Sequence, residues 1–202
     1  MPGYNRSLSS AVADGTAHMA TDLFSEATAP SFDDPLGMLA ACHGRIERQL
    51  ATLERLQRHL PEHGCDVDAR AAARGILRYF DTAAPNHHAD EEASVFPRLR
   101  NALPGRADML LADLEREHAA LVAQWRHLRP RLAGIAAGAR ANLSPKEVAD
   151  VRAAYAAHIA REEGELIPLA ARTFDAGTLA AIGHEMAARR GIDPAAPARR
   201  FG

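Results

Sequence analysis

The chain has 202 residues, of which 47% are hydrophobic and 25% are charged, as is usual for a globular protein. A formal net charge of -2 provides no broad basic surface, so nucleic acid is not an expected partner. The sequence has no run of about eighteen apolar residues, so we expect no membrane span. Cys42 and Cys65 are too few for a disulfide framework, and we therefore expect a cytoplasmic protein.

Residues 1–33 show no sustained apolar period, and we expect an irregular N-terminal arm with one short helical turn near Met19–Phe24. Asp34 followed by Pro35 is a typical helix start, with the aspartate as cap and the proline in the first turn. From there, apolar residues recur every three or four positions up to Leu60. This spacing predicts a first helix that closes at Pro61–Gly64.

A second helix is expected from Asp66 or Asp68 to Leu99. Pro85 should kink this helix or split it in two, because proline cannot donate a hydrogen bond to the preceding turn. Pro97 is a second weak point in the same helix.

Two further long helices complete the predicted bundle. Apolar residues from Leu111 to Ile135 follow steps of three and four without a gap, and the next such segment follows a capping box that begins at Ser144. A short fifth helix is expected over about 175–190. We therefore predict an all-α fold, an antiparallel up-down four-helix bundle over residues 34–173, followed by the short C-terminal helix and a tail within 174–202.

Polar residues occupy positions of the helix stripes that should face the core. Each predicted long helix places one histidine there, and the second and fourth helices add a glutamate one turn later. Burying such groups without partners costs several kcal/mol, so they need a common explanation. The six candidate metal ligands are His43, His87, Glu91, His118, His158 and Glu162.

The second and fourth helices also resemble each other in sequence. Residues 87–97 and 158–168 both read His-x-x-x-Glu-Glu, then three residues, an apolar residue and proline. The i, i+4 spacing places each histidine and glutamate on one helix face, where both can reach the same point. The site is therefore expected to have pseudo-twofold symmetry.

Imidazole with carboxylate suits iron, manganese, zinc or copper better than calcium or magnesium. Two metals use six such ligands better than one, with Glu91 and Glu162 as bridges and two histidines at each metal. A bridging oxide or hydroxide would leave roughly one open place per metal in a near-octahedral site. Dioxygen, nitric oxide or peroxide could bind there.

The residues next to these candidates have separate expected roles. His88 lies about 100° around an ideal helix from His87 and is expected at the surface. A register shift of one residue would instead replace the pair His87 and Glu91 by His88 and Glu92. Glu92, Glu163 and Glu165 are expected on a solvated face or as acceptors for the ligand histidines.

Four separated motifs, in this order, resemble the hemerythrin-like, HHE cation-binding domains of bacteria. The motifs are Phe32-Asp33-Asp34-Pro35-Leu36 leading to Cys42-His43, His87-x-x-x-Glu91-Glu92 ending in Phe96-Pro97, Glu117-His118, and His158-x-x-x-Glu162. The resemblance covers about residues 32–172 and implies a non-haem di-iron centre in an up-down bundle. Zinc or manganese are the expected substitutes for iron.

Two positions depart from the oxygen-carrying hemerythrins. Val122 stands where they have a second histidine in the third helix, and Glu162 stands where they have an aspartate. The set of four histidines and two glutamates is closer to the di-iron proteins that repair iron–sulfur clusters. The amino-terminal cysteine-bearing domain of those proteins has no counterpart in the sequence, so repair is not the leading interpretation.

We expect a metal-binding protein that binds or senses dioxygen, nitric oxide or a related small species, rather than a dedicated enzyme. A di-iron oxidoreductase for nitric oxide or peroxide is the main alternative, and it would need a redox partner protein because the sequence has no flavin or nicotinamide motif. The site could instead serve iron donation for cluster repair, iron storage or a purely structural role.

Overall fold

A computed structural model describes residues 31–139 and 142–193, and within these ranges the ordered elements are helices without a strand. The first and third long helices are α1 (Pro35–His63) and α5 (Asp108–Ala136). The second and fourth are built from several segments. Their segments are α2 (Val67–Arg78), α3 (Ala84–Asp90) and α4 (Phe96–Ala102), and then α6 (Pro145–Arg161) and α7 (Ile167–Thr173).

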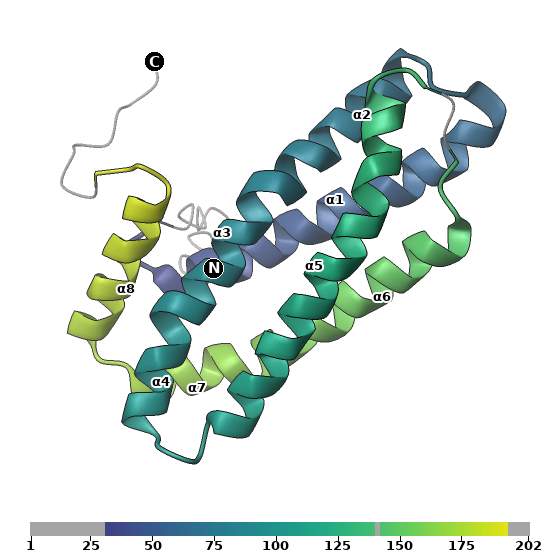
Figure 1. The fold of residues 1–202 in the computed structure, drawn as a ribbon. Helices are drawn as coiled ribbons and strands as arrows, with labels where there is room; N and C mark the ends of the chain where they lie inside the picture. The colour runs from purple at the N-terminus through teal and green to yellow at the C-terminus, as the bar shows by residue number, and fades with distance from the viewer. Residues whose placement is uncertain (1–30, 140–141, 194–202) are drawn as a thin grey trace, which may run out of the picture.

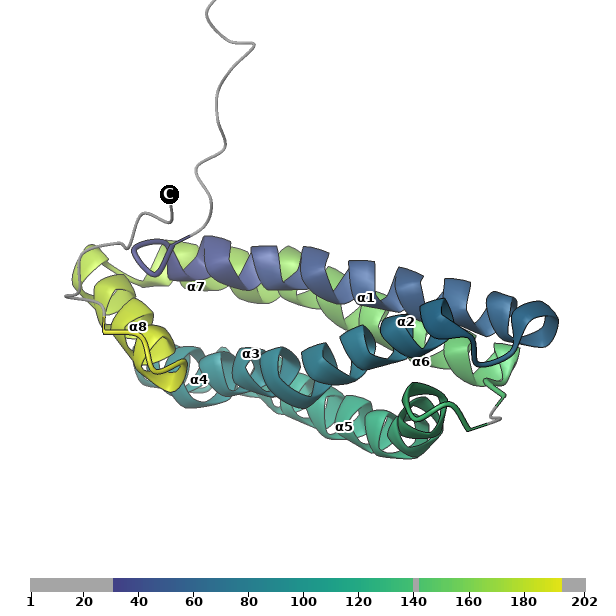
Figure 2. The ribbon, with the colours of Figure 1, turned by 90° about the horizontal axis from the view of Figure 1, so that it is seen from above.

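The long helices run antiparallel and form two layers (Figure 1). Seen from above, α1 lies beside α6 and α7, and the helix formed by α2, α3 and α4 lies beside α5 (Figure 2). The short helix α8 (Ala176–Arg189) lies at one end and contacts both α1 and α3. The predicted all-α bundle with a short extra helix is confirmed.

Four of the helix starts are capped by side chains that accept hydrogen bonds from the first turn, as such residues do at helix N-termini. These caps are Asp34, Asp66, Ser144 and Asp175. The predicted helical turn near Met19–Phe24, and nearly all of the predicted arm over 1–33, fall outside the described residues.

Three π-helical turns interrupt the second and fourth long helices, each just before a proline. Pro85, Pro97 and Pro168 each lie at the second position after such a turn. The carbonyl four residues before each proline, with which its ring would clash in an α-helix, lies inside the wide turn. The second helix therefore continues through Pro85 instead of splitting there. The π turns are η1 (Tyr79–Ala83), η2 (Glu91–Val95) and η3 (Glu162–Leu166).

The apolar core consists of two clusters with a polar layer between them. On α1, Leu39 belongs to one cluster and Ile46 to the other, and the buried His43 lies between them. On α5, His118 separates Leu114 from Leu121 in the same way. The candidate ligands thus share one layer in the middle of the bundle.

Helix α8 closes one end of the apolar cluster that contains Leu39. Ile182 and Met186 are fully buried in that cluster. A Cβ atom on Gly183 would lie 1.9 Å from the carbonyl oxygen of Phe32, so only glycine allows this close approach of α8 to the segment before α1. None of the described helices has the length and apolarity that a bilayer crossing requires.

Candidate metal centre

The structure brings all six predicted ligands together in the middle of the bundle. Each residue is at most 2% exposed, although all six side chains are polar. Two come from the second long helix and two from the fourth, in each case one turn apart. They are His43, His87, Glu91, His118, His158 and Glu162.

The two carboxylate oxygens of Glu162 face different pairs of histidines. Oε1 lies 2.9 Å from Nε2 of His158 and 3.3 Å from Nε2 of His118. Oε2 lies 2.9 Å from Nε2 of His43 and 3.8 Å from Nε2 of His87. Glu162 therefore lies between two groups of imidazole nitrogens.

Glu91 divides its oxygens between the same two groups. Oε1 lies 3.8 Å from Nε2 of His87, and Oε2 lies 3.3 Å from Nε2 of His118. Both carboxylates thus connect a His118 side of the site with a His87 side. A carboxylate placed in this way has one oxygen available to each of two cations.

Many of these buried atoms lack a hydrogen-bond partner, even where another polar atom is near. Unsatisfied buried polar groups are rare in folded proteins, because each costs about 1–3 kcal/mol. Nitrogen and carboxylate oxygen donors that converge without hydrogen bonds fit a transition-metal cation. The unpartnered atoms here are Nε2 of His43, both ring nitrogens of His87, both oxygens of Glu91, Nε2 of His158 and Oε2 of Glu162.

Three of the histidines also contact a glutamate outside the six-ligand set. The contact is made by Nδ1, the ring nitrogen on the other side of the imidazole from Nε2. Such a contact at Nδ1 fixes the ring and directs Nε2 into the site. Glu92 and Glu163 therefore take the acceptor role, whereas Glu165 is 58% exposed and lies near Arg161. Glu117 was not predicted, and its position directly before His118 was the only sequence signal. The pairs are His43 with Glu163 at 3.0 Å, His118 with Glu92 at 2.7 Å, and His158 with Glu117 at 2.8 Å.

Without a cation, the carboxylates and histidines share protons. Burial lowers the pKa of His118, but the neighbouring carboxylates of Glu162 and Glu91 outweigh it and raise the pKa to about 10. Burial works against the charged form of Glu162, yet the hydrogen bond from His118 and the three other imidazoles around the carboxylate hold its pKa well below the usual range. The largest effect on the pKa of Glu91 is burial, which raises it. A bound cation would replace these protons.

The comparisons with known proteins place the chain in a cation-binding family. The family model described as the hemerythrin HHE cation-binding domain matches residues 34–170. The chain belongs to this family. It is also 31% identical over 162 residues to an uncharacterized protein of Haemophilus influenzae, covering 80% of this chain and 93% of that protein. The buried cluster of this hemerythrin-like domain is thus a group of residues able to hold a metal.

In the second long helix, the pair His87 and Glu91 faces the site, so the register is not shifted by one residue toward Glu92. Glu91 is fully buried, whereas Glu92 is 43% exposed. Val122, where oxygen-carrying members of the family have another histidine, is 38% exposed.

The expectation that His88 lies at the surface is wrong, because its side chain is only 8% exposed. A helix in a four-helix bundle faces two neighbours, and the angle of about 100° between adjacent residues lets both point inwards. His87 packs against His43 of α1, with ring centroids 5.0 Å apart, and His88 packs against His118 of α5 at 4.0 Å. Burial, followed by the neighbouring His118, lowers the pKa of His88 to about 2.

Proposed function

We propose that this hemerythrin-like domain holds two iron ions and reversibly binds or senses a small diatomic molecule, dioxygen or nitric oxide. The observation that carries the proposal is the division of carboxylate oxygens at Glu91 and Glu162. Each glutamate has one oxygen toward His118 and the other toward His87. Two bridging carboxylates and two imidazoles per side are a donor set for a pair of transition-metal ions.

Ferrous ions, when bound, supply the electrons and the open coordination places that a diatomic molecule needs. The protein holds the imidazoles in place through Glu92, Glu117 and Glu163, whose carboxylates contact the outer nitrogens. Apolar clusters on both sides of the polar layer keep bulk water away. Such a dry site strengthens the electrostatic contacts inside it.

The first test is to purify the full chain anaerobically, measure its metals and record optical spectra before and after admitting air. About two irons per chain, with near-ultraviolet and visible bands that appear on oxidation, would support the proposal. Bands that disappear again when the gas is removed would support reversible binding. Zinc as the resident metal, or a chain without metal after anaerobic purification, would overturn it and leave a structural site.

The ligand set has a test of its own in the variant Glu162→Gln. Because Glu162 faces both groups of histidines, its loss should lower iron retention at both metals while the helices stay intact. Glu165→Gln, three residues further along the chain and largely exposed, is the matched control and should bind iron normally. Iron per chain and far-ultraviolet circular dichroism are the measurements. Unchanged iron content in Glu162→Gln would remove this residue from the set.

A further inference from the structure

His88 has a buried nitrogen that the six-ligand site leaves unexplained. Its ring is 8% exposed, and Nε2 has no hydrogen-bond partner. A buried histidine that serves only to fill the core normally has its polar nitrogens satisfied. The free-energy cost of burying this unpartnered nitrogen would be removed if Nε2 of His88 coordinated a cation.

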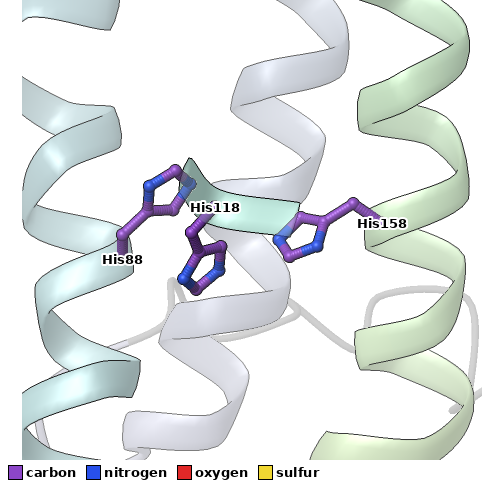
Figure 3. Close-up of side chains that lie close together, drawn as sticks. All are labelled: His88, His118 and His158. Atoms are coloured by element: carbon purple, nitrogen blue, oxygen red, sulfur yellow. The ribbon is translucent and has the colours of Figure 1, made fainter. Parts of the chain in front are cut away.

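The position of His88 supports such a role. One potential ligand atom each of His88, His118 and His158 lies within 4.8 Å of those of its two neighbours. Figure 3 shows His88 and His158 on helices at opposite sides, with the ring of His118 between them. A separate group, within the same distance limit, contains His43 and His87 together with both glutamates.

We propose that His88 is a seventh protein ligand, which binds the same metal as His118 and His158. The proposal rests on the two-metal function above and deepens it. Since the rings of His88 and His118 are stacked with an interplanar angle of 11°, metal binding requires the His88 ring to turn out of the stack. Rotation about the side-chain bonds of His88 changes the direction of the ring without moving the helix backbone.

The two metals then have unequal protein ligands. Three imidazoles and two carboxylate oxygens surround the metal at His118, whereas two imidazoles and two carboxylate oxygens surround the metal at His43 and His87. In a six-coordinate site, the second metal keeps more open places. The small ligand therefore binds at the metal held by His43 and His87.

The test compares the whole chain with its His88→Gln variant, both loaded with ⁵⁷Fe, and uses His127→Gln as control because His127 is exposed on α5. The unsubstituted protein should show two Mössbauer doublets of equal area, one for each iron environment. In His88→Gln, the doublet of the iron at His118 should shift, and this iron should pass to a chelator about ten-fold faster or more. The control should match the unsubstituted protein in both measurements.

The number of azide ions bound by the diferric protein then measures how many coordination positions are open. The unsubstituted chain should bind about one azide per two irons, and His88→Gln should bind a second, because both metals would then have four protein donors. A single doublet in the unsubstituted protein would overturn the proposal without any variant, even if His88→Gln failed to fold. Two irons with spectra, chelation rates and azide binding that His88→Gln leaves unchanged would overturn the role of His88 alone. Fewer than two irons in the unsubstituted chain would overturn the proposed function as well.

Discussion

At the scale of single residues, the histidines of the site differ in what holds their outer nitrogen. His158 contacts Glu117 through Nδ1 at 2.8 Å, and Arg161 holds the second oxygen of the same carboxylate at 2.8 Å. This arrangement leaves Glu117 little freedom, so the ring of His158 is fixed before a metal arrives. His87, by contrast, has no hydrogen-bond partner at either nitrogen.

The variant Glu117→Gln should weaken iron binding although Glu117 does not face the metal. The neutral amide holds the His158 ring less firmly and lowers its basicity as a ligand, an effect of about 10- to 100-fold on metal affinity. Glu115→Gln is the control, because Glu115 is 40% exposed and pairs with Arg100, which is 38% exposed. Competition with a chelator measures both affinities. Equal affinities would mean that Glu117 has no part in positioning His158.

The sequence pattern identified six of the buried polar residues because each lies on a stripe of apolar residues at helical spacing. It missed His88 because one inward stripe does not describe a helix that packs against α1 on one part of its surface and against α5 on another. It also missed Asp90, which is fully buried because the later helix α8 covers it. Both residues are buried by particular neighbouring helices. The spacing of apolar residues in one helix does not tell which other helices pack against it.

At the scale of elements, the sequence locates the prolines but does not predict how the helices accommodate them. A proline in a helical pattern indicates a local break, which is why a kink or a split is expected at Pro85. The structure accommodates Pro85, Pro97 and Pro168 through a wide turn before each. Two of these turns begin at Glu91 and Glu162, so the equivalent segments of the second and fourth helices deform in the same way.

Two glycines on the last helices should respond in opposite directions to replacement by alanine. Gly164 lies in the third π turn, and an added Cβ would meet no atom within 4 Å beyond the local backbone of its own helix, so Gly164→Ala should stabilise the fold by up to about 1 kcal/mol. Gly183→Ala should destabilise it by about 1–3 kcal/mol, because the Cβ would meet the carbonyl oxygen of Phe32. Urea unfolding of the metal-free chains measures both changes. A loss of stability in Gly164→Ala would show that the turn does not tolerate a side chain.

Helix α8 is attached to α3, the helix that carries His87, by a buried carboxylate. Asp90 is fully buried and contacts both Arg189 and Arg190 near the end of α8. Asp90→Asn would leave these two cations without a counter-charge and should cost about 3 kcal/mol of stability. Glu185→Gln is a control on α8, since its pair with Arg98 is 42% exposed at Glu185 and should contribute less than about 1 kcal/mol.

Both Asp90→Asn and Glu185→Gln are to be followed by thermal unfolding and by iron content. A shift of about 2–4 °C per kcal/mol is typical of a chain of this length. If α8 serves to hold Glu91 in place, Asp90→Asn should also lose iron more readily. Equal melting temperatures for the two variants would contradict the role of Asp90 as the attachment point.

At the scale of the whole molecule, the polar layer divides the core, and a metal bound there would couple folding to metal binding. The bundle retains an apolar cluster at each side of the site, so chelation should leave the helices formed. The metal-free protein should nevertheless unfold more easily, because a ligand that binds only the folded state adds about 4 kcal/mol when its concentration is a thousand times Kd. Circular dichroism and thermal unfolding, with and without iron, measure the two effects.

The pH dependence of the metal-free protein distinguishes this coupling from a nonspecific effect of iron. The pKa of His118 is about 10 in the fold and ordinarily 6.5, so the protonated histidine stabilises the fold fully below pH 6.5. This contribution is lost as the pH rises through 10, and the raised pKa of Glu91 acts in the same direction. The urea midpoint of the chelated chain should therefore fall between pH 6.5 and pH 10. The iron-loaded chain should show a smaller fall, because a metal-bound His118 has already lost its proton. Parallel curves with and without iron would contradict a site at which the cation replaces these protons.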